Sequence, residues 1–410
     1  MCNCVSSGQL SPELTTPRAR ARELGRATHR VHGGRMRGSS PTVLEASTLL
    51  AKLPQLRERV GQTWCANYYE PYHKQLTFLD ALMRHVSPKI VTALCPNPGT
   101  SGYTCEAVRF WRTLVPPVVS AMRELSIAPA WAGSAGGDGM NLYTFGVFFG
   151  DSLYFFRREY PKAQLLGFDS FTGLPAEKPG EVKRRGWVPG TFNTWRPHLV
   201  IQRLREDLGG RGRTFFERGF FNASLTPQLA RSLGKAAIID IDSDIYVSAY
   251  QALDWIFTHG LAAIGTLVVY DDWMDYACGP RVNQSIASLR GGAPRQRKAM
   301  REAVQAGRFG DLFSAGEPKA HREIARKHSV DFRCVAGACG RITSPQGQCD
   351  VHGPFGAVFV IAGFGIDVDR DSPDAGVENN SPAELAKWRA QNRGCAFVMR
   401  EKYTVETNER

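Results

Sequence analysis

The chain has 410 residues, of which 43% are hydrophobic, 10% aromatic and 22% charged. This composition is typical of a globular protein with a large buried core in one or two domains. The formal net charge is +12, and residues 1–40 carry seven arginines against Glu13 and Glu23, so +5 of this charge lies in the tail. The other basic runs, 183–187 and 294–302, are short and far apart. A nucleic-acid-binding surface, which gathers basic and aromatic side chains on one face, is therefore not expected.

Ten cysteines are spread along the chain without the dense, even spacing of a small disulfide scaffold, so we expect reduced thiols in an intracellular compartment. No apolar run approaches the roughly 18 residues of a membrane-spanning helix, so no membrane partner is expected. The first 40 residues lack the apolar core of a secretory signal. Their Arg-, Ser- and Thr-rich composition fits a disordered tail or a transit peptide. The expected location is cytoplasmic, with a plastid or mitochondrion as the alternative.

The next region, 41–129, has a helical pattern. Apolar residues recur at intervals of three and four in 42–60 and 73–86, and 95–105 reads as a loop. We expect this helical lead-in to act as a lid or as a contact surface in a homo-oligomer. The Gly-rich segment that begins at residue 130 ends the pattern and marks a domain boundary.

From 130 to 366, short β-rich runs alternate with helical segments, which predicts a doubly wound α/β domain with a mostly parallel sheet. The segment 367–381 is polar and rich in Asp and Pro, so the C-terminal part, 367–410, is predicted to begin with a linker. A capping box, Ser381 with Glu384, then predicts the start of a short helix. The predicted strands are 142–149, 163–169, 213–219, 236–242, 264–272, 330–335 and 356–364, and the predicted helices between them include 151–160, 225–233, 247–259 and 318–327.

The first strand of this domain runs into Gly146 and Gly150 and then into a helix. In a doubly wound fold this turn faces the crevice at the carboxyl ends of the strands, where small residues let a cofactor approach the backbone. The next strand ends at Asp169, nineteen residues after Gly150, where a carboxylate can bind the ribose hydroxyls of a nucleotide-like cofactor.

Carboxylates follow the fourth and fifth strands. The fourth ends in Asp240, Asp242 and Asp244, and the fifth ends in Asp271 and Asp272. Because the carboxyl ends of neighbouring parallel strands share one edge of the sheet, these side chains should converge beside the crevice.

Carboxylates that lie close together raise each other's pKa unless a cation neutralises them. Asp oxygens suit Mg²⁺, so the pattern predicts a magnesium site. The alternative is that Asp242 or Asp244 caps the helix that starts near Ile245, while Asp271 and Asp272 lie on a solvated loop.

A metal beside a cofactor crevice suggests a reaction in which a chelated substrate hydroxyl loses its proton and attacks the cofactor. If the cofactor is S-adenosylmethionine, methyl transfer requires mainly proximity and orientation, because the sulfonium is a good leaving group. A carboxylate of the Asp240, Asp242 and Asp244 set is then available as the base.

Several motifs together resemble the macrocin O-methyltransferase (TylF-like) family of class I S-adenosylmethionine-dependent methyltransferases. The resemblance covers about 143–364, and GFDSFTGLP at 167–175 is its most specific element; the others are the GTF at 190–192, ERGFFNASL, IDIDSDIYVSAYQAL, VVYDDW and GEPKAHREIARKH. It implies a seven-stranded sheet with a reversed last strand, bound S-adenosylmethionine, and Mg²⁺ that positions a sugar hydroxyl for methylation.

The resemblance also implies roles for single residues. Asp242 and Asp244 are the expected catalytic acids. The metal ligands are Asp271 and Asp272 together with Asp242 or, in the longer motif of the related catechol-type enzymes, Asp240. The expected cofactor contacts are Gly146, Val147, Gly150, Ser152, Asp169, Ser170, Phe171, Gly219 and Phe220.

The sequence departs from the family pattern at three places, of which one is the stretch 279–315, longer than the family pattern leads us to expect. Thr144 stands where an acidic residue is usual two positions before the first glycine. An insertion carries Cys334, Cys339, Cys349 and His352, which fit either a zinc knuckle or a hairpin without metal.

The function predicted from the sequence is Mg²⁺-assisted, S-adenosylmethionine-dependent O-methylation of a hydroxylated small molecule, in particular a sugar or glycoside. Three alternatives stay open: an inactive methyltransferase-like binding protein, a nucleic-acid methyltransferase and a nicotinamide-dependent oxidoreductase. The last needs only the glycine turn and Asp169.

Overall fold

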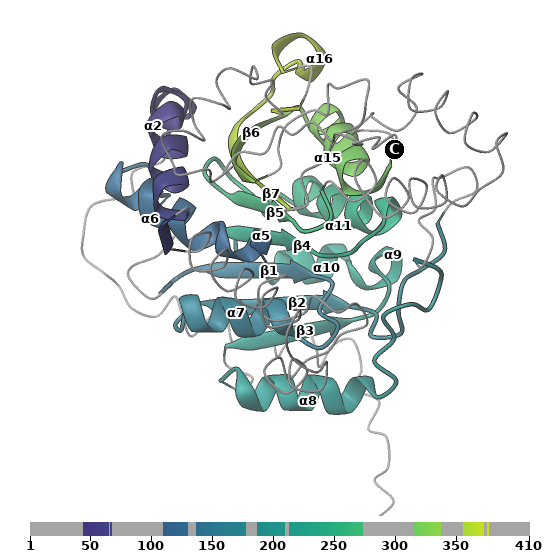
Figure 1. The fold of residues 1–410 in the computed structure, drawn as a ribbon. Coiled ribbons are helices and arrows are strands. Elements are labelled where there is room, and N and C mark those ends of the chain that lie inside the picture. Colours follow the sequence, from purple (N-terminus) through teal and green to yellow (C-terminus); the bar gives the residue numbers. More distant parts are fainter. Residues whose placement is uncertain are drawn as a thin grey trace, which may run out of the picture.

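The structure is a computed structural model, shown in Figure 1. It describes residues 44–64, 66–67, 110–129, 137–177, 187–209, 213–273, 315–337, 356–372 and 375–376. The predicted helix at 73–86, the loop at 95–105 and the C-terminal helix after residue 380 lie outside this part of the chain.

A seven-stranded sheet forms the centre of the molecule (Figure 1). Its strand order is β3-β2-β1-β4-β5-β7-β6, and all neighbouring pairs are parallel except those of β7, which runs antiparallel to both β5 and β6. This is a doubly wound α/β architecture with a mostly parallel seven-stranded sheet, so the predicted fold class is confirmed. The strands are β1 (Asn141–Phe145), β2 (Gln164–Asp169), β3 (Thr214–Arg218), β4 (Ile238–Ile241), β5 (Leu267–Tyr270), β6 (Val330–Gly337) and β7 (Ala357–Phe364).

Helices cover both faces of the sheet, because the central strands are apolar on both sides. In β1, Tyr143 and Phe145 belong to one hydrophobic core and Leu142 to the other, and β4 and β5 alternate in the same way. The first core is closed by α9 (Phe221–Ser224), α10 (Pro227–Arg231), α11 (Tyr246–Thr258) and α15 (Gly316–Lys327). The second is closed by α2 (Ala46–Trp64), α6 (Val115–Glu124), α7 (Asp151–Glu159) and α8 (Pro197–Asp207).

The helical lead-in packs directly on the sheet. Leu49, Leu56 and Val60 of α2 are fully buried in the second core, and the indole Nε1 of Trp64 donates to the hydroxyl of Thr113 at 3.0 Å. Thr113 ends α5 (Phe110–Thr113), a short helix just before α6. The described part of the lead-in therefore contributes to the core of the α/β unit. Whether this region also joins two copies of the chain stays a prediction.

The predicted helices differ from the observed ones at several places. The helix predicted at 225–233 is shorter than expected: α10 covers only Pro227–Arg231, and α9 (Phe221–Ser224) precedes the segment. The hydroxyl of Thr226, the N-cap of α10, accepts from the N–H of Leu229. Helix α8 was not among the predicted helices. The short helix α16 (Val368–Asp371) lies where a linker was predicted, and Val368 is buried against the first core.

The structure bears on the expectations about free cysteines and about membrane-spanning helices. Cys334, on β6, is disulfide-bonded, and its partner lies outside the described residues. The expectation of reduced thiols is therefore wrong at this position, and Cys334 is not available as a zinc ligand; Cys339, Cys349 and His352 lie outside the described residues. Among the described helices, none has the length and apolarity to cross a membrane.

Candidate active site

The turn after β1 brings the backbone very close to the end of β4. Gly146 has φ +97°, and a Cβ atom at this position would lie 1.6 Å from the carbonyl oxygen of Asp242. Gly150, with φ +88°, is the N-cap of α7, where a Cβ atom would meet Leu204 at 2.2 Å. Both glycines are therefore required by close contacts as well as by left-handed backbone conformation. The strand order changes direction between β1 and β4, which is where doubly wound proteins bind their ligands.

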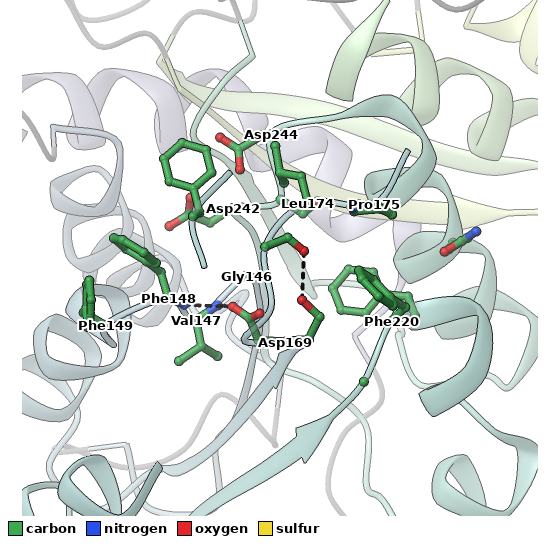
Figure 2. A pocket seen from close by; sticks show the side chains of 18 of the residues that line it. Gly146, Val147, Phe148, Phe149, Asp169, Leu174, Pro175, Phe220, Asp242 and Asp244 are labelled. Carbon is green, nitrogen blue, oxygen red and sulfur yellow. Dashed lines mark hydrogen bonds between the residues drawn. The ribbon is translucent and has the colours of Figure 1, made fainter. Parts of the chain in front are cut away.

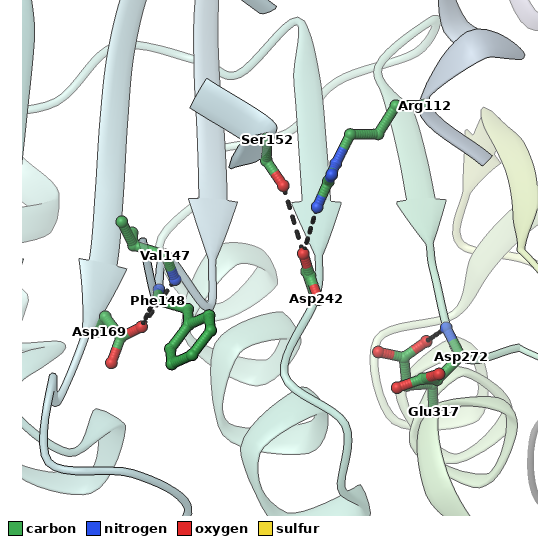
Figure 3. A network of polar contacts seen from close by, with 8 residues as sticks. All are labelled: Arg112, Val147, Phe148, Ser152, Asp169, Asp242, Asp272 and Glu317. Atoms are coloured by element: carbon green, nitrogen blue, oxygen red, sulfur yellow. Dashed lines mark hydrogen bonds and ion pairs between the residues drawn. The ribbon is translucent and has the colours of Figure 1, made fainter. Parts of the chain in front are cut away.

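Asp169, the last residue of β2, holds this turn in place. Its Oδ2 accepts hydrogen bonds from the backbone N–H groups of Val147 at 2.7 Å and Phe148 at 2.8 Å, and its Oδ1 accepts from the N–H of Phe171 at 2.6 Å. Burial raises the pKa of Asp169, while the three N–H donors oppose the rise. The carboxylate thus joins the glycine turn to the loop after β2, as Figure 3 shows for its contacts with Val147 and Phe148.

A cavity of about 180 Å³ opens at this edge of the sheet. Figure 2 shows Asp169 at one side of it, Asp242 and Asp244 at the other, and Gly146 between them. Of the predicted site residues, the cavity wall contains Gly146, Val147, Asp169, Ser170, Gly219, Phe220, Asp242 and Asp244. Three predicted cofactor contacts stand behind it: Gly150 begins α7, Ser152 is buried within it, and Phe171 is fully buried in the second core.

Aromatic side chains form much of the remaining cavity wall, and sequence reasoning did not single out most of them. Phe148, Phe149, Phe192 and Phe220 are 36–41% exposed, although they are large and apolar. Phe148 packs edge-on against Phe192 with ring centroids 5.7 Å apart. The GTF motif could have indicated Phe192, because it places an aromatic ring next to a flexible glycine, but its position beside Phe148 depends on the fold.

Arg112 is a further residue that the sequence analysis missed. It belongs to α5, is 3% exposed, and its Nη2 lies 2.5 Å from Oδ2 of Asp242. The hydroxyl of Ser152, on α7, donates to the same oxygen at 3.2 Å. Figure 3 shows both contacts converging on Asp242. A cation from a helix far upstream in the sequence therefore reaches the predicted catalytic acid.

Asp240 lies behind the cavity and not in its wall. It pairs with Thr144 in the β1–β4 register and is fully buried on the face of Ile238, two residues before it in β4. Burial raises the pKa of Asp240 to about 7, with Arg112 opposing the rise and Asp242 adding to it. Neither oxygen of Asp240 has a hydrogen-bond partner at normal bonding geometry, and the hydroxyl of Thr144 has none either. Of the two residues left open above as metal ligands, Asp242 lines the cavity and Asp240 does not.

A second group of carboxylates lies at the end of β5. Asp271 is 9% exposed and Glu317, the second residue of α15, is fully buried. Oε2 of Glu317 accepts from the backbone N–H of Asp272 at 3.2 Å (Figure 3). Burial raises the pKa of Asp271 well above its ordinary value, and the charges of Asp242, Asp272 and Glu317 add to the rise. Burial likewise raises the pKa of Glu317, and Asp272, Asp242 and Asp244 contribute.

Two observations argue against the alternative explanation for the carboxylates. The N-cap of α11 is Ile245, and the N–H of Tyr246, the first residue of this helix, donates to Oε1 of Glu177 at 3.0 Å. Asp271 is buried rather than on a solvated loop. Within the described residues, no three His, Cys, Asp or Glu side chains already surround a common point as a ready metal centre.

The cluster nevertheless has the chemistry that a cation requires. Oδ1 of Asp271 and Oε1 of Glu317 are buried acceptor atoms without a hydrogen-bond donor, and the neighbouring negative charges raise each other's pKa. A hard divalent cation would relieve both costs. The residues present fit such an ion in charge and in donor type, and their side chains would have to turn toward it.

Comparisons with known proteins give no family assignment. No protein-family model matches the chain, and no curated protein sequence matches it. Among solved structures, the chain is similar to CalS11, a calicheamicin methyltransferase, with 18% identity over 67% of this chain and 92% of that one and a TM-score of 0.29. It is also similar to an O-methyltransferase from Bacillus cereus in complex with SAH, with 14% identity over 69% of this chain and 95% of that one and a TM-score of 0.32.

The O-methyltransferase NovP is a third similar structure, with 19% identity over 47% of this chain and 73% of that one and a TM-score of 0.27. These three TM-scores, 0.27 to 0.32, are low. The fold assignment therefore rests on the chain's own strand order, with β7 reversed between β5 and β6.

Proposed function

We propose that this protein is an S-adenosylmethionine-dependent O-methyltransferase that acts on a hydroxyl group of a small molecule. The observation that carries the proposal is the cavity at the switch point between β1 and β4. There the glycine turn after β1 lies between Asp169, at the end of β2, and Asp242 and Asp244, which follow β4. The glycine turn and Asp169 suit a nucleoside with ribose hydroxyls, and Asp242 and Asp244 suit a reacting hydroxyl.

The charge of the cavity wall supports a cationic cofactor. Four carboxylates line it, those of Asp151, Asp169, Asp242 and Asp244, against the single guanidinium of Arg112 among the described residues. S-adenosylmethionine carries a positive sulfonium, which a negative, partly enclosed site stabilises, and its demethylated product is neutral at that sulfur. The same charge disfavours an acceptor rich in phosphate groups, and so argues against a nucleic-acid methyltransferase or a nicotinamide dinucleotide.

We further propose that Asp242, Asp271 and Asp272 hold a divalent cation, with Mg²⁺ as the expected ion. When bound, the ion would lower the pKa of the acceptor hydroxyl. Asp240 is not included, because it lies behind the cavity on the face that Arg112 approaches. Asp244, two residues after Asp242, also lines the cavity, where its carboxylate can accept the hydroxyl proton. Arg112 and Ser152 orient Asp242 through its Oδ2 atom.

The acceptor is proposed to be a neutral hydroxylated compound such as a sugar or glycoside. The exposed rings of Phe148, Phe149, Phe192 and Phe220 provide apolar surface beside the carboxylates. A sugar ring or an attached apolar group stacks well on such surfaces, while its hydroxyls remain available to the acids.

A second candidate function is binding without catalysis. Asp242, one of the proposed metal ligands, already forms an ion pair with Arg112. Thr144 stands where the resemblance leads us to expect an acid. A protein of this kind would bind S-adenosylmethionine without any response to divalent cations.

Isothermal titration of the full chain with S-adenosylmethionine, with and without Mg²⁺, tests both candidates. The proposed enzyme binds the cofactor, loses this binding in Asp169→Ala, and loses the Mg²⁺ response in Asp271→Ala/Asp272→Ala. Asp254→Asn is the matched control, because Asp254 pairs with Lys327 and His328 away from the cavity. Absence of cofactor binding in the folded wild-type chain would reject the enzyme and the binding protein together.

A further inference from the structure

Glu317 is a buried acid that the proposed reaction does not use. It stands in the first turn of α15, forty-five positions after Asp272, and none of its surface is exposed to solvent. One oxygen, Oε2, accepts from the backbone N–H of Asp272 at 3.2 Å. The other, Oε1, is buried without a hydrogen-bond partner.

A purely structural role of Glu317 would explain its hydrogen bond to Asp272 but not its negative charge. The hydrogen bond to Asp272 closes the turn after β5, and a neutral glutamine would make it equally well. A glutamine would also avoid a carboxylate next to Asp271 and Asp272. The carboxylate therefore adds an electrostatic cost that the turn itself does not require.

The neighbouring side chain repeats the same pattern. Oδ1 of Asp271 is also a buried acceptor without a donor, and Asp271 is 9% exposed. These buried acids need either protons or a cation to balance their charge, and a divalent cation would take the place of the protons and bind the free acceptor oxygens. Figure 3 shows the carboxylates of Glu317 and Asp272 side by side at the end of β5.

We propose that Glu317 is a fourth carboxylate ligand of the divalent-cation site formed by Asp242, Asp271 and Asp272. The inference rests on the metal site of the proposed function and extends it to α15. The cation would then join the ends of β4 and β5 to the first turn of the helix that covers β5 and β6. Carboxylate oxygens suit Mn²⁺ and Ca²⁺ as well as Mg²⁺, so Mn²⁺ can serve as a probe of the site.

The test is Mn²⁺ binding by the full chain, measured from the EPR signal of the free ion, which needs no catalysis. Glu317→Gln keeps the hydrogen bond to Asp272 and removes the charge, and it is expected to weaken Mn²⁺ binding at least about tenfold. Glu323→Gln is the control on the same helix, because Glu323 accepts from the hydroxyl of Tyr246 instead. The control is expected to bind Mn²⁺ as the wild type does.

Equal Mn²⁺ affinity of Glu317→Gln and the wild type would overturn the proposal, and so would a wild-type chain that binds no Mn²⁺. The same preparations are also titrated with S-adenosylmethionine in the absence of metal. If the cofactor binds, only the metal site is rejected; if it does not bind, the proposed function is rejected as well. If Glu317→Gln does not fold, Glu317→Asp keeps the charge but shortens the side chain. A weaker Mn²⁺ affinity of Glu317→Asp supports the proposal, and an unchanged affinity overturns it.

Discussion

Nη2 of Arg112 lies 2.5 Å from Oδ2 of Asp242, and this ion pair joins α5 of the lead-in to the end of β4. The Arg112 side chain is 4% exposed and that of Asp242 is 25% exposed, so water screens the pair only on the cavity side. Arg112 also opposes the rise in the pKa of Asp240 behind the cavity. The charge of Arg112 thus stabilises the ionised forms of both Asp240 and Asp242, so the lead-in contributes to the electrostatics of the site.

Replacement of Arg112 should therefore destabilise the fold. In Arg112→Met, Asp240 and Asp242 lose their nearby cation, and the expected loss in the free energy of unfolding is about 3–5 kcal/mol at neutral pH. Urea denaturation measures it. Arg59→Met is the control, because Arg59 pairs with Glu124 on the surface, with both side chains at least half exposed, and this loss should stay below about 1 kcal/mol. Similar losses in the two variants would mean that the buried pair contributes no more than a surface pair.

Gly146→Ala should disrupt the site through its backbone. The added Cβ would lie 1.6 Å from the carbonyl oxygen of Asp242, so β1 and β4 must separate at their ends. We expect loss of S-adenosylmethionine binding in isothermal titration and a loss of about 2–4 kcal/mol in stability.

Gly139→Ala separates this clash from backbone strain. Gly139 has φ +81°, but a Cβ atom there meets nothing within 4 Å. This variant carries the strain of the left-handed conformation alone, about 1 kcal/mol, and should bind the cofactor normally. If both variants bound it equally well, the close approach of the turn to Asp242 would not matter for binding.

Most strands were predictable because they are largely apolar runs bounded by turn residues or charges; β3 and β6 also include charged residues. Asp169 and Asp242 were predictable as site residues for the same reason, since each follows the last apolar residue of its run. Asp240 was harder to place: its side chain belongs to the alternation of β4, which ends at Ile241, and this puts it behind the cavity.

Arg112 and Glu317 were not predictable from local pattern. Arg112 acts on a residue 130 positions away, and Glu317 bonds a residue 45 positions away. In the sequence, each is an ordinary charged residue of a helix, and only the packing of α5 and α15 around the sheet brings it to the site. The exposed phenylalanines likewise look like core residues until the strand ends are arranged around a cavity.

Asp169 offers a test of the cofactor side of the cavity. Asp169→Asn keeps the size of the side chain and one acceptor oxygen. It removes the negative charge and the second acceptor oxygen; in the wild type, the two oxygens accept from backbone N–H groups at 2.6–2.8 Å. The expected result is S-adenosylmethionine binding at least tenfold weaker, about 1.4 kcal/mol, because charge-assisted hydrogen bonds are the stronger kind. Ser170→Ala, which removes a neighbouring hydroxyl that donates to Gly173, is expected to have a smaller effect. The reverse order of these two effects would contradict the assignment of Asp169 to the ribose.

His321 makes the stability of the fold sensitive to acid. It is fully buried on α15, its Nε2–H donates to the carbonyl of Ala375 at 2.9 Å, and its Nδ1 accepts from the hydroxyl of Tyr270 at 2.9 Å. Burial lowers the pKa of His321 to about 4, with the contact to Ala375 opposing the shift. The imidazole of the native state is therefore neutral throughout the range from pH 5 to pH 7.

The sign of the pH dependence follows from the proton balance. In the unfolded chain this histidine takes up a proton near its ordinary pKa of about 6.5, whereas the native state does not do so until about pH 4. Stability is therefore fully present above about pH 6.5 and falls as the pH decreases toward 4, with about 2 kcal/mol lost by pH 5. Asp271 and Glu317 act in the opposite direction, because their raised pKa values mean that the native state holds protons that the unfolded state has released.

The variant His321→Gln isolates the histidine from these carboxylates. A glutamine can donate to Ala375 and accept from Tyr270, but it does not titrate. Its free energy of unfolding in urea should be lower than that of the wild type at pH 7 by about 1–3 kcal/mol, since the ring also packs against Phe332 and Phe359. That difference should shrink by about 2 kcal/mol at pH 5, because only the wild type pays the cost of keeping the imidazole neutral. A difference that stays constant between pH 7 and pH 5 would show that His321 titrates equally in the folded and unfolded chains.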